Sequence, residues 1–239
     1  RIKENKLAEE TKEQMEIGEK MSETVNEVKD SGASSLSKSD KRALWLIIIA
    51  VFLWFVGFNA VETFWSSYAT LYLNSDISQG SIYTIVLTIS SLITFIPAGW
   101  LSTKIGRKYT IMIGILLIIV ALTSAYFIKD TGVRVDGEDF NTISVLFFPV
   151  FIAAGIGWAM INVCSYPMVV EYANKSNLGK YTGVYYTASM LAQSITPIFV
   201  GFLFKDFGWN ILCLYTAFFM LLAFIVFIFV KTKKPVIHK

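Results

Sequence analysis

Six long apolar segments follow one another along the chain, after a polar stretch of about forty residues. They occupy positions 43–72, 81–102, 109–128, 143–170, 181–204 and 209–230. Each is about 20 residues long or longer, which is the length an α-helix needs to cross a bilayer core of roughly 30 Å. The connections between the segments are short and polar, so consecutive helices would run in opposite directions. This pattern predicts an all-α membrane protein with six transmembrane helices.

Polar residues are unevenly distributed among the six segments. In the first, second, fourth and fifth segments, polar side chains recur three or four residues apart and therefore share one helix face. Polar stripes inside a bilayer face protein or water, so we expect these four helices to line a pathway near the membrane midplane. The stripe residues that we take as candidate substrate or coupling-ion contacts are Asn59, Glu62, Ser66, Trp158, Asn162 and Gln193.

The third and sixth segments are almost wholly apolar, and we expect both helices to lie outside the pathway. The aromatic residues of the sixth segment are expected to face lipid. These are Phe218, Phe219, Phe224, Phe227 and Phe229.

A repeat relates the two halves of the apolar region. Shifting the chain by 102 positions superposes Gly99 on Gly201 and Gly106 on Gly208. Helices separated by three crossings run in opposite directions, so the two groups of three would have inverted orientations. A 3+3 inverted repeat is typical of secondary transporters.

The composition excludes several classes of protein. Of the 239 residues, 54% are hydrophobic and only 16% are charged, whereas a soluble domain carries about 25% charged residues. A soluble enzyme, a nucleic-acid-binding module and a disulfide scaffold are therefore excluded. The sequence shows no nucleotide-binding loop, metal-ligand cluster or nucleophile–base pair, so we expect no enzymatic activity, no cofactor and no metal site.

The distribution of charge predicts the topology. Twelve lysine and arginine residues flank one set of segment ends and three flank the other, which places both termini in the cytoplasm and the protein in the cell membrane. Residues 1–42, with nine basic and ten acidic side chains, are predicted to form a charged cytoplasmic linker. The bundle is predicted over 43–230 and a basic cytoplasmic tail over 231–239. The chain begins with Arg1, and we interpret it as a piece of a longer polypeptide.

The turn after the second segment carries a recognisable motif, Gly99-Trp100-Leu101-Ser102-Thr103-Lys104-Ile105-Gly106-Arg107-Lys108. It resembles the major facilitator superfamily signature Gly-x-Leu-x-Asp-x-x-Gly-Arg-Arg/Lys, with Thr103 where the family usually has Asp. That departure puts in doubt the charge interaction that the family makes through Asp. The resemblance implies half of a twelve-helix fold, namely the C-terminal half, with a missing N-terminal six-helix half as its partner.

The loops on the same side of the membrane supply the candidate gating residues. These are Gly99, Lys104, Gly106, Arg107, Lys108, Glu171 and Lys180. An ion pair among Arg107, Lys108 and Glu171 is expected to latch that face of the protein.

A narrower resemblance points to the substrate. The run Asn59-Ala60-Val61-Glu62-Thr63-Phe64-Trp65 resembles the first helix of the second half in bacterial sucrose-transporter-like permeases, relatives of the glycoside–cation symporters. The hairpin from Glu171-Tyr172 to Gly179-Lys180-Tyr181-Thr182-Gly183 is similar to one in those families. The resemblance implies transport of a sugar, a disaccharide or glycoside, coupled to protons by symport, with the lipid bilayer as surroundings and no nucleic-acid partner.

Two readings remain open for the stripe residues. Glu62 is the only carboxylate inside a predicted membrane segment; it would carry a proton, bind a cation, or serve as a fixed hydrogen-bond partner. Trp158 and Asn162 would contact a sugar or would simply pack between helices. For the whole protein, the alternatives to sugar transport are a non-transporting scaffold or receptor of the same fold and a drug or lipid exporter.

Overall fold

The computed structural model describes residues 36–73, 75, 77–128, 142–174 and 176–231. Within these residues the structure is helical throughout and contains no strand. All six helices are long and apolar enough to cross a membrane, which confirms the predicted fold class. Residues 1–35 of the linker predicted over 1–42, and most of the basic tail, lie outside the described residues. The helices are α2 (Lys38–Leu71), α3 (Ile77–Ile105), α4 (Arg107–Ile128), α5 (Thr142–Tyr172), α6 (Leu178–Phe207) and α7 (Ile211–Ile228).

Local chemistry explains where the helices begin and end. Ser37 caps the start of α2, where its hydroxyl oxygen accepts a hydrogen bond from the backbone N–H of Ser39 at 3.3 Å, so α2 begins five residues earlier than the predicted segment at 43. Gly106 separates α3 from α4 with a φ of +91°, and Gly208 ends α6 with a φ of +75°. Only glycine adopts such φ values without strain, so the two glycines matched by the repeat make equivalent turns.

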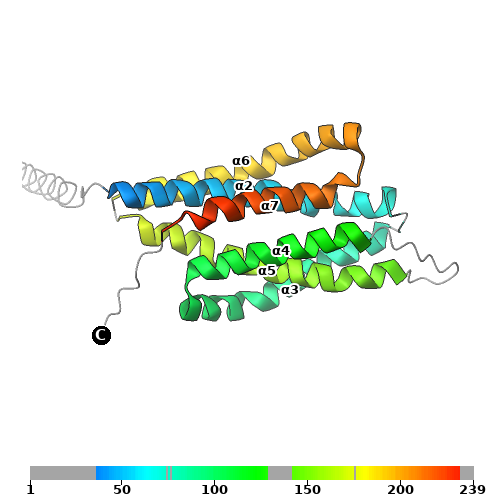
Figure 1. Ribbon diagram of the computed structural model, residues 1–239, viewed down its shortest axis with the longest axis horizontal. Coiled ribbons are helices and arrows are strands. Elements are labelled where there is room, and N and C mark those ends of the chain that lie inside the picture. The colour runs from blue at the N-terminus through cyan, green and yellow to red at the C-terminus, as the bar shows by residue number, and fades with distance from the viewer. Residues whose placement is uncertain (1–35, 74, 76, 129–141, 175, 232–239) are drawn as a thin grey trace, which may run out of the picture.

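The packing of the helices repeats in the same way. The first helix of one repeat, α2, packs against the second and third helices of the other, α6 and α7. In return, α5 packs against α3 and α4, and the two third helices, α4 and α7, contact each other. Figure 1 shows the resulting groups, with α2, α6 and α7 above α3, α4 and α5. Exchanging the two repeats reproduces this pattern, so the bundle is an inverted 3+3 repeat.

Close approaches at two glycines involve matching positions on α4 and α7. A Cβ added to Gly157 would lie 2.5 Å from the carbonyl oxygen of Gly114, and one added to Gly57 would lie 3.2 Å from the carbonyl oxygen of Thr216. The residues nearest Gly157 are Gly114, Leu117 and Ile118, and those nearest Gly57 are Thr216, Phe219 and Met220. Adding 102 to the first three numbers gives the second three, whereas the two glycines themselves are 100 positions apart. The shift found in the letters therefore matches the partner positions on α4 and α7, and the glycines of α2 and α5 are offset from it by two residues.

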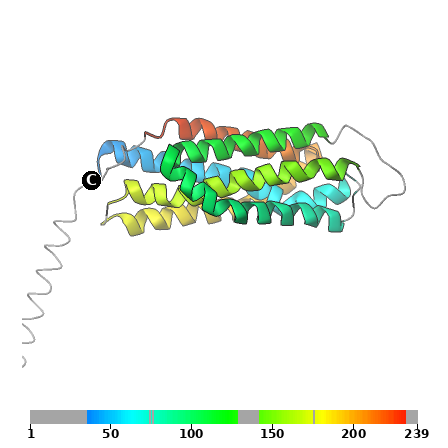
Figure 2. The same cartoon turned by 90° about the horizontal axis from the view of Figure 1, so that it is seen from below.

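The two helices expected outside the pathway, α4 and α7, are neighbours in the bundle. Figure 2 shows α4 and α7 together along one side, with α3 and α6 along the opposite side. The prediction that all the aromatic residues of the sixth segment face lipid is wrong for Phe227, which is fully buried and packs edge-on against Trp54 of α2 at 6.0 Å between ring centroids. A helix that crosses beside another helix necessarily turns one face inward.

Most of the described lysine and arginine residues lie near the helix ends that meet on the left in Figure 1, and we call this end of the bundle the basic end. The starts of α2, α4 and α6 and the ends of α3, α5 and α7 meet there. The opposite end, called the far end, carries Lys205 among the described residues. The basic side chains described at the basic end are Lys38, Lys41, Arg42, Lys104, Arg107, Lys108, Lys180 and Lys231.

Candidate functional site

The polar stripe of α2 opens onto the surface of this chain. Asn59 is half-buried and accepts a hydrogen bond at 3.4 Å from the hydroxyl of Thr63, while Glu62 and Thr63 are exposed. Ser66 departs from this pattern, because a Cβ on Gly80 of α3 would lie 3.1 Å from its Cα. The start of α3 thus covers α2 at Ser66, and the open stripe consists of Asn59, Glu62 and Thr63.

Glu62 lies in the second half of α2, towards the far end of the bundle. It is the 25th of the 34 residues of α2, so it lies about 11 Å beyond the middle of that helix at 1.5 Å per residue. The middle of α2 is at Trp54 and Phe55. The carboxyl group therefore belongs to the third of α2 nearest the far end, and its depth in a membrane stays a prediction.

Trp158 stands at the middle of α5 and joins that helix to α2. Its ring stacks on Phe58, with centroids 4.0 Å apart and planes 14° apart, and meets Phe55 edge-on at 5.3 Å. One face of the indole is consequently occupied by protein, although the side chain remains half-buried. Trp158 can present only its remaining surface to a ligand, and the packing interpretation holds for the face that Phe58 covers.

The two amide side chains of the candidate site bond to their own helices. The Nδ2 group of Asn162 donates to the carbonyl oxygen of Trp158 at 2.9 Å, and the Nε2 group of Gln193 donates to that of Ser189 at 3.3 Å. These bonds fix each amide in one orientation. Asn162 is half-buried and Gln193, at the middle of α6, is exposed, so each amide can still offer its oxygen to a hydroxyl donor.

The contact between Phe58 and Trp158 fixes the order of the candidate residues along the bundle axis. Because α2 and α5 are antiparallel, Glu62 lies one turn from Phe58 towards the far end, whereas Asn162 lies one turn from Trp158 towards the basic end. Each turn is about 5.4 Å. The structure thus arranges the candidate residues as a ladder of carboxyl, indole and amide groups, and does not gather them at one point.

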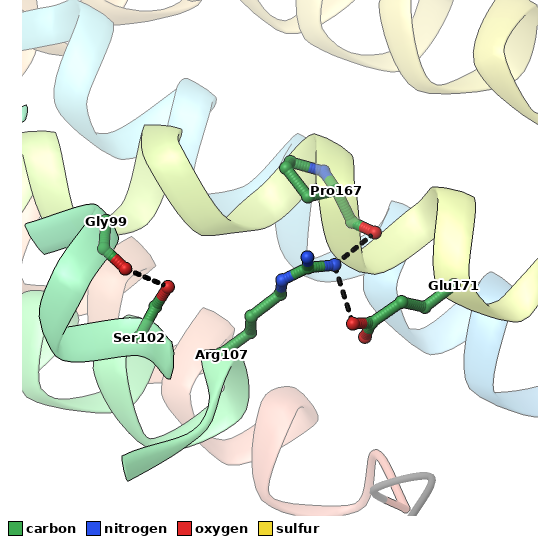
Figure 3. Close-up of polar contacts among 5 residues, drawn as sticks. All are labelled: Gly99, Ser102, Arg107, Pro167 and Glu171. Carbon is green, nitrogen blue, oxygen red and sulfur yellow. Dashed lines mark hydrogen bonds and ion pairs between the residues drawn. The ribbon is translucent and has the colours of Figure 1, made fainter. Parts of the chain in front are cut away.

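The loop motif forms a compact turn at the basic end. The Ser102 hydroxyl donates to the carbonyl oxygen of Gly99 at 2.7 Å, as Figure 3 shows. Thr103, which replaces the Asp of the family signature, donates to the carbonyl oxygen of Trp100 at 2.7 Å. Lys104 places its ammonium 3.6 Å from the centroid of the Trp100 ring. A cation over an indole at a membrane boundary is a favourable pair, so this turn has polar groups suited to an interface.

Arg107 connects the motif to α5. One guanidinium nitrogen donates to the carbonyl oxygen of Pro167 at 2.8 Å and lies 2.7 Å from a carboxylate oxygen of Glu171 (Figure 3). The expected pair within the motif region is therefore Arg107 with Glu171. Lys180 is exposed in the first turn of α6 and joins no ion pair within the described residues.

Lys108 has a different role from its neighbour. Its ammonium donates to the carbonyl oxygens of Ile228 at 2.8 Å and Val230 at 2.6 Å. The last carbonyls of a helix have no partner within it, and a lysine there satisfies them and complements the helix dipole. The Tyr172 hydroxyl donates to the carbonyl oxygen of Lys231 just beyond. Together they fasten the end of α7 to α4 and α5.

Sequence reasoning missed a cluster of hydroxyl-bearing residues between α5 and α6. The Ser165 and Tyr185 hydroxyls lie 2.9 Å apart in a buried hydrogen bond, and those of Tyr166 and Thr182 lie 3.4 Å apart. The signal was present in the chain, because Tyr166 follows Asn162 by one helical turn. Its pairing with α6 could not be read from either helix alone.

The described residues contain no group of His, Cys, Asp and Glu side chains that could hold a metal ion. No curated protein matches the chain. The family model described as Major Facilitator Superfamily matches residues 46–239. That match covers all six helices except the first turns of α2, and the inverted repeat and the Gly99–Lys108 turn agree with it. The chain therefore belongs to the Major Facilitator Superfamily and forms a six-helix half of this fold of membrane transporters.

Proposed function

We propose that the chain is the C-terminal half of a secondary transporter that moves a disaccharide or glycoside together with protons by alternating access. The observation that carries the proposal is the ladder of Glu62, Trp158 and Asn162. An indole offers an apolar plane to the C–H face of a sugar ring, and amide groups bond to its hydroxyls. A carboxyl group in a membrane helix needs a functional or structural reason to be there.

The orientation is part of the same proposal. The basic end faces the cytoplasm, because lysine and arginine residues concentrate on that side of cell-membrane proteins. An N-terminal six-helix half would cover the open face of α2, α3 and α6, where Glu62, Thr88 and Gln193 are exposed. Exposed polar residues beside long apolar helices are better placed against protein or water than against lipid tails.

Glu62 is the proposed coupling residue. Its carboxyl group, exposed on α2 near the far end, takes up a proton when the pathway opens to the outside. It releases the proton after the pathway closes and reopens to the cytoplasm. Thr63, next to Glu62, donates a hydrogen bond to Asn59, which lies about one turn nearer the middle of α2. This pair connects the carboxyl group with the level of Trp158.

The experiment uses the full-length protein reconstituted in vesicles with an imposed proton gradient. Labelled sucrose, maltose, melibiose and lactose are offered in turn, and we expect gradient-driven accumulation of at least one, which a protonophore abolishes. Glu62→Gln should retain downhill exchange of that sugar and lose its accumulation. Asp206→Asn is the matched control, since this exposed carboxylate lies in the last turn of α6 at the far end, and accumulation should persist.

Two results would count against the proposal. If no sugar accumulates under the gradient, the substrate class is wrong, and a scaffold or an exporter of drugs or lipids takes its place. If Glu62→Gln still concentrates sugar, Glu62 is structural and the coupling residue lies elsewhere in the protein.

A further inference from the structure

Two hydrogen bonds join α5 to α6 near the basic end. Ser165 and Tyr185 form the buried one, with 2.9 Å between hydroxyl oxygens, and Tyr166 and Thr182 form the second, at 3.4 Å. The two helices contact each other far less than α5 contacts α3 or α4. The two hydroxyl–hydroxyl hydrogen bonds are therefore an important part of the contact between α5 and α6.

The three tyrosine rings of this cluster differ in their exposure. Tyr185 is the anchor, with only 5% of its surface exposed, whereas Tyr186 is 47% exposed and Tyr166 is half-buried. The Tyr166 ring centroid lies 5.6 Å from that of Tyr185 and 5.8 Å from that of Tyr186, with the latter planes only 35° apart. Tyr185 is buried and packs between α5 and α6. Tyr166 and Tyr186 lie outside it and form a partly exposed aromatic surface.

This surface continues the candidate site. Trp158, Asn162 and Tyr166 follow one another at intervals of four residues along α5, and all three are half-buried. On α6, Tyr186 and Gln193 are seven residues apart and both are exposed. Eight residues separate Trp158 from Tyr166, which is about 12 Å of helix at 1.5 Å per residue. One sugar ring is too short to reach both aromatic side chains, because it is only about as long as one helical turn of roughly 5.4 Å.

We propose that Tyr166 and Tyr186 form a second subsite that holds the second ring of a two-ring glycoside, while the first ring lies at Trp158 and Asn162. This inference rests on the proposed sugar transport. The tyrosine planes pack against the C–H face of the second ring, and the tyrosine hydroxyls bond to its hydroxyl groups. The site therefore prefers a disaccharide or aryl glycoside to a monosaccharide.

The test compares two sugars in the full-length protein in vesicles. The labelled disaccharide that the unmodified protein exchanges is the probe, and its unlabelled parent monosaccharide is the competitor. Tyr186→Ala should raise the half-saturating disaccharide concentration about tenfold, equivalent to about 1.4 kcal/mol, and leave inhibition by the monosaccharide within twofold. Tyr186→Phe should retain most of the affinity because it keeps the ring. Tyr109→Ala removes another tyrosine, 59% exposed at the basic end of α4, and should change neither value.

The other possible results refute either the second subsite alone or the proposed sugar transport as well. If the unmodified protein exchanges no sugar, the proposed function fails and the subsite fails with it. If it exchanges disaccharide and Tyr186→Ala shifts neither sugar, or shifts both equally, Tyr186 is an interfacial anchor and only the subsite is refuted. Tyr186→Leu keeps the bulk of the side chain without an aromatic plane, so it should show the same selective loss even if the alanine variant folds poorly.

Discussion

Arg107 at the start of α4 and Glu171 in the last turn of α5 form an ion pair, with 2.7 Å between a guanidinium nitrogen and a carboxylate oxygen. Both side chains are partly exposed, and exposed pairs contribute at most about 1 kcal/mol. The pair joins two helices of the same half. It therefore holds the start of α4 against the end of α5, and its role as a latch on one face of the transporter stays a prediction.

Removing the two partners of this pair should have unequal effects. Glu171→Gln removes the ion pair with Arg107 and should lower stability by about 0.5 kcal/mol. Arg107→Gln also removes the bond to the Pro167 carbonyl oxygen and should lower stability by about 1–2 kcal/mol. Thermal unfolding of the purified protein measures both. Lys180→Gln, at an exposed position without a described ion pair, is the control and should leave the midpoint unchanged; equal losses for the two test variants would refute the role of Pro167.

The close approach of α4 and α5 gives a second prediction. Gly157→Ala would place a Cβ 2.5 Å from the Gly114 carbonyl oxygen and 2.8 Å from Ile118, so the helices must move apart. We expect a loss of about 1–3 kcal/mol in thermal unfolding. Gly183→Ala is the matched control, because nothing lies within 4 Å of that Cβ and alanine favours a helix over glycine. A stable Gly157→Ala protein would show that α4 and α5 do not pack this closely.

Lys108 should protect the end of α7. Lys108→Met keeps much of the aliphatic chain but leaves the carbonyl oxygens of Ile228 and Val230 without their ammonium donor. Amide hydrogen exchange in the last turn of α7 should become about tenfold faster, which corresponds to about 1.4 kcal/mol of local opening. Lys104→Met, which removes the cation over Trp100, should leave exchange in α7 as it was. Unchanged exchange in both variants would mean that the end of α7 is held by other contacts.

Much of the fold could be predicted because membranes restrict the choices. In lipid every backbone polar group must be bonded internally, so apolar length alone predicted six helices, and the glycines at 106 and 208 predicted two turns. The pairing of α2 with α6 and α7 was not predicted as such. It depends on where close approach is possible, and only the structure shows that Gly57 and Gly157 supply it.

The candidate site was predicted less completely. Helical spacing placed Asn59 and Glu62 on one face, as the structure does. It could not show that Phe58 covers one side of Trp158, because that contact joins residues 100 positions apart. Nor could it show Ser165 bonded to Tyr185 across two helices. A stripe on one helix predicts which residues share a face, but the neighbouring helix decides which of them remain open.

The division between polar and apolar faces can be tested by thiol accessibility. Thr63 on α2 and Gln193 on α6 are exposed, and so are Leu116 on α4 and Leu221 on α7. Exposure alone therefore does not distinguish these four positions. If α2 and α6 line a wet pathway while α4 and α7 face lipid, a charged, water-soluble thiol reagent reaches only the first two, because it does not enter the bilayer core.

Each position is changed to cysteine in the full-length protein in vesicles, where the buried Cys164 and Cys213 should add little background. We expect labelling of Thr63→Cys and Gln193→Cys at least tenfold faster than that of Leu116→Cys and Leu221→Cys. The transported sugar should slow labelling of Gln193→Cys, because Gln193 is one of the candidate substrate contacts. A membrane-permeant thiol reagent provides the control, since it should modify all four variants. Equal labelling of the four by the charged reagent would show that α4 and α7 also border water and that the pathway is not confined to the polar helices.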